Sequence, residues 1–313
     1  TRAKARGPMR APLSRGMVAW LRQHRLNLAL TCPLFLYLLV LTVGPILDTV
    51  RLSLTDPLNG GFPSSDNYRA LLGSEVFRTA LINTIVVALF SISLQLSLGM
   101  AVALTLHANF RFRALVRTVM LLPLGVPTVV AGAVMLLIFA RSGYFNAVLF
   151  ALADALHLLG IQWHFVPLSW TAGGGWRTLA TVAVADMWKV LPMVTLILLA
   201  GLQAIPRDVN EAADVDGAGR WHRFARVTLP LLFPYITMAV ILRAIDAFRI
   251  FELALVLAGR VEPVLGTYIW NRYGPPTNDP FTAAAASIAL FAVILGFVVL
   301  YLRFTVGARE GTP

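Results

Sequence analysis

The chain has 313 residues, of which 58% are hydrophobic and only 13% are charged. A water-soluble globular protein could not bury that much apolar surface, so the composition excludes that class and indicates an integral membrane protein. The single cysteine, Cys32, can form no internal disulfide, and Lys and Arg outnumber Asp and Glu by 26 to 15.

The N-terminal segment 1–27 contains seven Lys or Arg residues and no acidic residue. Directly before an apolar run, such a segment indicates a cytoplasmic tail that contacts anionic lipid headgroups, and we favour this over an arm that binds nucleic acid. The run at 28–50 is too long for a signal peptide and lacks a small-residue cleavage site, so it is predicted to be the first membrane span. Pro33 lies near its start, and Gly44 and Pro45 predict a kink.

The second predicted span is 79–106, after a polar, turn-rich segment at 51–78 that is predicted to be external. Asn83, Ser91 and Gln95 recur at spacings that keep them near one face of a helix. That face is therefore predicted to look toward other helices rather than toward lipid.

The third predicted span, 115–140, follows a short basic link at 107–117 that is predicted to be cytoplasmic. Pro123 and Pro127 lie one helical turn apart within this span. Their rings remove backbone hydrogen bonds that only neighbouring helices can replace in lipid, which predicts a kinked helix surrounded by protein.

The segment 141–177 is predicted to be external. Its apolar part, 144–160, is too short and interrupted to span the bilayer, so we expect it to lie along the membrane interface. The run Gly173 to Gly175 predicts a bend back into the bilayer. The segment also carries three tryptophans that suit an aromatic belt at headgroup depth or, alternatively, an aromatic box for a ligand: Trp163, Trp170 and Trp176.

Three further spans are predicted at 178–202, 229–257 and 281–301, with an external loop at 259–280 and a C-terminal tail at 306–313. The segments assigned to the cytoplasm carry more Lys and Arg than the external segments do. Both termini are therefore predicted to be cytoplasmic.

The loop at 205–228 is polar but carries helix-forming signals. Pro206 suits a first helical turn and Gly217 suits a helix stop, which predicts a helix of about ten residues. Ala212 and Ala213 leave the middle of this helix almost without side chains. Small residues let two backbones approach, so the helix is predicted to lie in a groove on another protein.

The same loop resembles the cytoplasmic coupling motif, with its Glu-Ala-Ala start, of binding-protein-dependent ABC importer permeases. Val227 stands where Ile is commoner, and Pro234 also fits the pattern. The residues that the resemblance assigns to coupling with the ATPase are Glu211, Ala212, Ala213, Asp216, Gly217, Ala218, Phe224, Leu229 and Pro230.

Two weaker matches are similar to the maltose and trehalose permeases of the carbohydrate branch. The external run with Asn67, Tyr68, Phe77, Asn83 and Thr84 is one of them. The other is the end of the fifth span, with Phe248, Arg249, Phe251 and Glu252. With the coupling motif, the resemblance covers residues 28–305.

The resemblance implies an all-α integral membrane protein with six transmembrane helices in the type I ABC importer permease fold. It also implies a second homologous permease subunit that completes a heterodimer, two cytoplasmic ATPase subunits that bind ATP and Mg, and an extracytoplasmic sugar-binding protein. Such an assembly would lie in the bacterial cytoplasmic membrane and pass a sugar, of di- or oligosaccharide size, by alternating access.

The sequence carries no signature of covalent catalysis. It has no phosphate-binding loop of the Gly-x-x-x-x-Gly-Lys-Ser/Thr type, so the chain is not expected to hydrolyse ATP by itself. No Ser-His-Asp nucleophile signature is present. The histidines show no metal-ligand spacing, so neither a metal nor a cofactor is expected on this chain. They are His24, His107, His157, His164 and His222.

Charged and aromatic residues within the spans are candidates for a sugar pathway. A charge at the centre of a membrane helix costs about 2.5 to 3.5 kcal/mol unless it is paired or wetted, so these side chains must face the bundle. Asp186 and Lys189 either form ion pairs that fix helix packing or join the pathway. The pathway is predicted to be lined by Asn83, Gln95, Trp188, Arg243, Asp246, Phe248, Arg249 and Phe251.

Two alternatives stay open at this point. One is an ABC permease for glycerophosphodiesters, amino acids or another small polar solute. The other is a secondary transporter or channel, which would give its two halves a repeated pattern of broken helices. No convincing repeat is present, and that class offers no reason for the coupling motif.

Overall fold

The computed structural model describes residues 25–161, 165–171 and 173–310, and within these ranges it contains helices and no strands. Within this described part of the chain, six segments are long and apolar enough to cross a membrane: Ala29–Ser53, Glu75–His107, Thr128–Leu158, Gly175–Ala204, Arg220–Phe248 and Pro280–Thr305. This confirms the predicted class, an all-α membrane protein with six spans.

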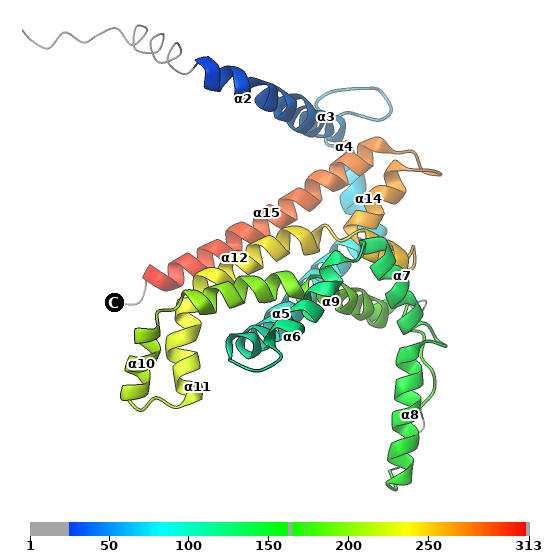
Figure 1. The fold of residues 1–313 in the computed structure, drawn as a ribbon. Helices are drawn as coiled ribbons and strands as arrows, with labels where there is room; N and C mark the ends of the chain where they lie inside the picture. Colours follow the sequence, from blue (N-terminus) through cyan, green and yellow to red (C-terminus); the bar gives the residue numbers. More distant parts are fainter. Residues whose placement is uncertain (1–24, 162–164, 172, 311–313) are drawn as a thin grey trace, which may run out of the picture. The chain divides into compact units, whose positions relative to one another are not determined.

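The helices follow one another in a simple order (Figure 1). They are α2 (Arg25–Leu38), α3 (Gly44–Ser53), α4 (Asp66–Gly73), α5 (Glu75–His107), α6 (Arg113–Gly125), α7 (Thr128–Phe139), α8 (Tyr144–Leu158), α9 (Gly175–Ala204), α10 (Arg207–Val215), α11 (Arg220–Arg223), α12 (Leu229–Phe248), α13 (Glu252–Leu257), α14 (Leu265–Tyr273) and α15 (Pro280–Glu310).

The chain divides into two compact units, Thr1–Leu52 and Ser53–Pro313. The first contains α2 and most of α3, with a π-helical turn at Leu39–Val43 between them. In this turn Gly44 donates its N–H to the carbonyl of Leu39, five residues back. The turn widens because Pro45 has no N–H and its ring excludes the carbonyl four residues earlier. The predicted irregularity at Gly44 and Pro45 is therefore present as a π turn.

A second π turn, Phe224–Thr228, joins α11 to α12 in the second unit. Leu229 donates its N–H to the carbonyl of Phe224, and Pro230 follows, so the two π turns share one cause. The fifth membrane helix consequently begins at Arg220, well before the predicted start at 229.

The predicted end of the fifth span at 257 is wrong, because α12 stops at Phe248. Arg249 and Ile250 close the helix with hydrogen bonds to carbonyls three residues back, and a separate helix, α13, follows. Gly266 at the start of α14 approaches this break so closely that a Cβ on it would lie 2.6 Å from the carbonyl oxygen of Ile250. Packing by α14 thus coincides with the break, although no glycine or proline marks the break in the sequence.

The predicted third span, 115–140, is broken at Val126 and Pro127 into α6 and α7. The kink is present as expected. No residue of α6 is fully buried, but α6 packs against α9, and α7 buries Ala131, Gly132 and Met135, so this chain surrounds the predicted span in part. By length and hydropathy, the candidate span begins at Thr128 and runs through α8 to Leu158. The apolar stretch at 144–160 is thus part of a candidate span, whereas we expected it to lie along the interface.

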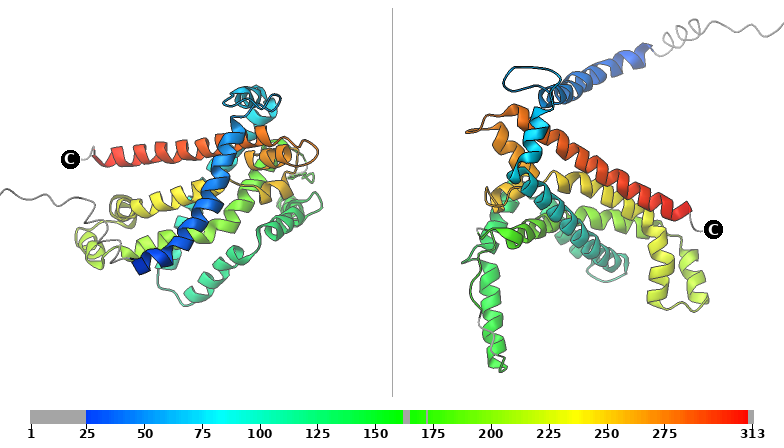
Figure 2. Two further views of the ribbon diagram at one scale, coloured as in Figure 1. Left: turned by 90° about the horizontal axis from the view of Figure 1, so that it is seen from above. Right: turned by 180° about the vertical axis from the view of Figure 1, so that it is seen from behind.

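The core of the second unit is formed where α5, α9 and α12 pack together (Figure 2). One apolar cluster includes Leu106, Val194, Leu198 and Leu232. Small residues allow close approach: a Cβ on Gly201 of α9 would lie 2.6 Å from Cγ of Tyr235 on α12. These helices hold the polar groups of the candidate site described below.

We expect Gly201→Ala to destabilise the protein by about 1 to 3 kcal/mol, because the added methyl overpacks the contact with Tyr235. Thermal unfolding of the purified protein in nanodiscs measures this. Gly296→Ala is the matched control, since a Cβ at Gly296 of α15 meets open space. Equal unfolding temperatures for the two variants would contradict the close packing of α9 on α12.

Candidate functional site

The short helix predicted in the loop at 205–228 is present as α10. The helix ends at Val215, and Gly217 two residues later has a φ of 72°, which lies in the left-handed region that favours glycine. Ala218 donates its N–H to the carbonyl of Ala213, which is the hydrogen bond of a Schellman stop. The local signals at Pro206 and Gly217 therefore predicted this helix correctly.

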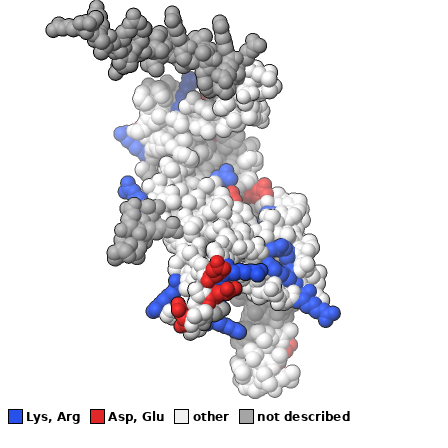
Figure 3. Space-filling view, turned by 60° about the vertical axis from the view of Figure 1, so that its left-hand side comes forward, with Lys and Arg blue, Asp and Glu red and all other residues white. Residues whose placement is uncertain are grey.

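The surface around α10 is open and charged. Glu211 and Ala212 are exposed, whereas Ala213 is 8% exposed. Two large apolar side chains are also exposed, Val215 at 88% and Trp221 at 77%. The neighbouring charged residues that are exposed are Arg207, Asp208, Asp216 and Arg220. Acidic and basic side chains lie next to each other in the lower part of Figure 3, in which the side of the molecule that carries α10 comes forward.

The other predicted coupling residues continue from α10 into the membrane helix. Ala218 and Phe224 are partly buried, and Phe224 lies 5.8 Å from the ring of Trp221. Leu229 and Pro230 are exposed and directly follow the π turn. Helical backbone thus runs without a break from Arg220 to Phe248, so a displacement at α11 would be transmitted along α12.

A buried ion pair joins α9 to α12. Arg243 is 1% exposed, and its Nη2 donates to Oδ2 of Asp186 at 2.7 Å. Its Nε donates to Oε1 of Gln95 at 2.6 Å. Gln95 Nε2 donates to the backbone carbonyl of Asp186 at 3.1 Å, and the hydroxyl of Ser91 donates to the Asp186 carboxylate. Three helices therefore meet in one polar network in which every member has a partner.

A cleft of about 490 Å³ opens beside this network. Within it, Asp246 Oδ1 lies 3.4 Å from Nη2 of Arg249, and their side chains are 49% and 62% exposed. Arg243 Nη1 lies 3.7 Å from Asp246 Oδ2. The charged side chains that line the cleft are Asp186, Lys189, Arg243, Asp246, Arg249 and Glu252. Acids and bases are equal in number, so the lining carries no formal net charge.

Half of the predicted pathway residues line this cleft, namely Arg243, Asp246, Arg249 and Phe251. Gln95 is fully buried and contacts the network only, so it holds Arg243 rather than facing the cleft. Thr128 and Glu252 also line the cleft, although neither was predicted to lie in the pathway. Their position next to a helix break, at the start of α7 and of α13, is the signal that could have found them.

Three predicted pathway residues lie elsewhere. Asn83 Nδ2 donates to Oε2 of Glu262 at 3.1 Å, which holds the loop before α14 against α5. Phe248 is 2% exposed and packs 5.2 Å from the ring of Phe297, because α12 turns this residue toward α15. Trp188 is partly buried against the cluster that contains Val182. The structure does not bring these residues to the cleft.

Asp186 and Lys189 form no ion pair with each other among the described residues. Asp186 pairs with Arg243 between helices, which is the packing role that the sequence left open. Lys189 Nζ donates to the carbonyl of Val126 at 2.7 Å. Pro127 interrupts the helix there, so that carbonyl has lost its place in the regular hydrogen-bond ladder, and Lys189 supplies the missing donor.

We expect Lys189→Met to destabilise the protein by about 1 to 3 kcal/mol, because the carbonyl of Val126 loses its donor. Thermal unfolding in nanodiscs is the measurement. Lys189→Arg retains a donor and serves as the matched control. If Lys189→Met unfolds at the wild-type temperature but transport is lost, the lysine serves the pathway instead.

Of the three tryptophans predicted to form an aromatic belt, Trp163 lies outside the described residues. Trp170 Nε1 donates to Oδ1 of Asn146 at 2.9 Å and its ring packs edge-on against Phe145 at 5.1 Å. Trp176, at the start of α9, is 73% exposed. Trp170 thus links the segment before α9 to α8, and these two tryptophans form no aromatic box. The predicted bend is present, since Gly174 and Gly175 have φ of 67° and 69°.

A bundle of membrane-spanning helices around a polar cleft defines a membrane transport protein. The family model described as "Binding-protein-dependent transport system inner membrane component" matches residues 95–307, and the chain belongs to this family.

Relatives of the chain share close to a third of its residues. The trehalose/maltose transport system permease protein MalF of Thermococcus litoralis is 34% identical over 291 residues, which cover 90% of this chain and 94% of that protein. The trehalose transport system permease protein SugA of Mycobacterium tuberculosis is 31% identical over 258 residues, or 76% of this chain and 74% of that protein.

A solved structure confirms the predicted type I ABC permease fold. It is a chain of a bacterial ABC transporter involved in the import of the acidic polysaccharide alginate, and it superposes with a TM-score of 0.78. The match covers 95% of this chain and 99% of that one at 22% identity, which supports the fold alone.

Proposed function

We propose that this chain is the membrane subunit of an ATP-driven importer and passes a neutral di- or oligosaccharide across the bacterial cytoplasmic membrane by alternating access. The observation that carries the proposal is the cleft, whose three acidic and three basic side chains leave it without net charge. Such a lining offers donors and acceptors to hydroxyl groups but no excess charge to an ion. The names of the relatives, which include trehalose and maltose permeases, support a sugar as the substrate.

Within the cleft, Asp246 and Arg249 are exposed enough to exchange their mutual contact for hydrogen bonds to sugar hydroxyls. Phe251 lines the same cleft and packs 5.7 Å from the ring of Trp270. An aromatic ring beside charged donors suits the mixed apolar and polar surface of a pyranose. Asp186 and Gln95 would act behind them by holding Arg243 in place.

The proposed importer needs other subunits besides this chain. A single α10 serves one ATPase subunit, so two ATPase subunits, which bind ATP and Mg, require a second permease subunit. We propose a heterodimeric membrane core, an extracytoplasmic sugar-binding protein and cytoplasmic termini. A homodimer seen by native mass spectrometry in a fully active assembly would count against the heterodimer.

Uptake by proteoliposomes that contain the whole assembly tests the substrate and the class of transporter. We expect ATP-dependent accumulation of a neutral disaccharide but not of a glycerophosphodiester. Uptake driven by an ion gradient without ATP would instead support a secondary transporter.

Asp246→Ala should lower kcat/KM for sugar uptake by about 10-fold to 100-fold, the effect of losing a hydrogen bond to a charged group. Phe251→Ala should lower it as well. Asp66→Ala is the matched control, because Asp66 forms an exposed ion pair with Arg69 outside the cleft. Wild-type uptake by a folded Asp246→Ala complex would remove this cleft from the pathway.

A further inference from the structure

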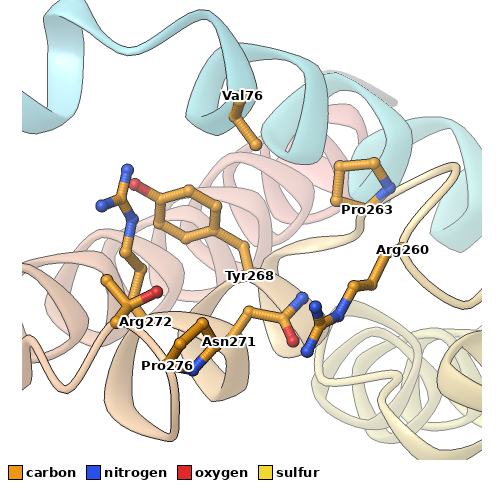
Figure 4. A pocket seen from close by; sticks show the side chains of 8 residues that line it. Val76, Arg260, Pro263, Tyr268, Asn271, Arg272 and Pro276 are labelled. Atoms are coloured by element: carbon orange, nitrogen blue, oxygen red, sulfur yellow. The ribbon is translucent and has the colours of Figure 1, made fainter.

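A small cavity of about 210 Å³ lies beside α14, at the end of the second unit opposite α10 and α11 (Figures 1 and 4). The distribution of Lys and Arg predicts that this end is external. Val76 and Pro263 form apolar walls. The polar side chains that line the cavity are Arg260, Tyr268, Asn271, Arg272 and Thr277. No acidic residue lines it, in contrast to the balanced cleft between α9 and α12.

The hydroxyl of Tyr268 is a buried polar group without a partner. The residue is 3% exposed, and its hydroxyl has no hydrogen-bond partner among the described residues. The ring is fixed by an edge contact with Phe77 at 5.7 Å and by the guanidinium of Arg272, 5.4 Å from the ring centre. Figure 4 shows the hydroxyl next to that guanidinium. Buried hydroxyls nearly always have partners, so this one is an unmet hydrogen-bonding group beside the cavity, which an external acceptor reaches once the guanidinium of Arg272 moves aside.

The two arginines of the cavity also lack acidic partners. Among the described residues, no carboxylate lies within 4.0 Å of Arg260 or Arg272. Arg69 and Arg78, in the region of α4 and the start of α5, each pair with an acidic residue three positions earlier. Two guanidinium groups, a phenol hydroxyl and the Asn271 amide can all donate hydrogen bonds. These side chains give the cavity a positive lining that attracts a carboxylate.

Its size restricts the source of that carboxylate. Pockets for small ligands usually measure about 300 to 1,000 Å³, so 210 Å³ suits a single side chain better than a disaccharide. We propose that this cavity receives an Asp or Glu side chain of the extracytoplasmic binding protein when that protein docks. The inference rests on the proposed function for the existence of that partner, but not for the identity of the sugar.

The test is the Kd of the binding protein for the whole transporter in nanodiscs, measured directly and without transport. We expect Arg260→Glu and Arg272→Glu each to raise this Kd by about 10-fold or more. Tyr268→Phe preserves the packing and removes only the hydroxyl, so it should raise the Kd while the unfolding temperature stays equal or rises. Arg69→Glu is the matched control and should leave the Kd unchanged.

Unchanged affinity in the two arginine variants, with the wild-type complex binding normally, would overturn the inference. An effect seen only in nanodiscs that contain phosphatidylglycerol, and absent in pure phosphatidylcholine, would also overturn it, since the cavity would then hold a lipid headgroup. If the wild-type complex binds its partner but transports no sugar, the proposed function fails, and a raised Kd in the variants still supports the docking cavity.

Discussion

Asp186→Ala should destabilise the folded protein by about 3 to 5 kcal/mol, because it leaves the guanidinium of Arg243 buried without its carboxylate. Arg243→Ala should have a similar effect, since the carboxylate of Asp186 would then lose its cation. Thermal unfolding of the assembled transporter in nanodiscs measures both. This loss of stability is large for one residue because the remaining charge between α9 and α12 is buried without a partner.

The double variant Asp186→Leu with Arg243→Met replaces both charges at once, so it distinguishes the cost of one unpaired charge from the contribution of the whole ion pair. Apolar residues of similar size often replace a buried ion pair at little cost, so we expect this variant to recover most of the lost stability. The matched control is Asp66→Ala. Asp66 forms an exposed ion pair with Arg69, so we expect the free energy of unfolding to change by only about 0 to 1 kcal/mol. Wild-type unfolding temperatures in both single variants would contradict a buried ion pair.

Gly217→Trp should disrupt the contact between the membrane subunit and the ATPase. An L residue with φ near 72° costs about 1 to 2 kcal/mol, and the new side chain would project into open space beside α10, where we expect the ATPase to bind. In reconstituted transporter we expect uptake and stimulated ATPase activity to fall about 10-fold or more while the membrane subunit stays folded.

Gly217→Asn is the control, because asparagine tolerates the left-handed conformation and adds little bulk. It should retain most of the activity. If Gly217→Trp instead left both uptake and ATPase stimulation at wild-type levels, α10 would not be the coupling helix.

Local signals made some of these features predictable from sequence. The limits of α10 follow from Pro206 and Gly217, which act within their own turn of helix. The end of α12 was not predictable in this way, because no glycine or proline stands near Phe248. Gly266, close in space but distant in sequence, approaches the chain at that break.

The same limit applies to the candidate site. Spacing within one helix suggested that Arg243 meets Asp246, yet its closest carboxylate is Asp186, 57 residues away. The carbonyl that Lys189 contacts lies 63 residues away. Contacts of this kind depend on how helices rotate against one another, which a single sequence does not record.

The π turn before Pro230 also determines how far α11 is rotated relative to α12 about the helix axis. Each residue of an α-helix advances the chain by about 100°, so the extra residue of the π turn offsets the azimuth of α11 from that of α12. The number of residues between Phe224 and Pro230 therefore sets the direction in which α10 leaves the membrane helix. Substitutions there alter a surface, whereas deletion of one residue would turn α10 through more than a quarter of a circle about the axis of α12.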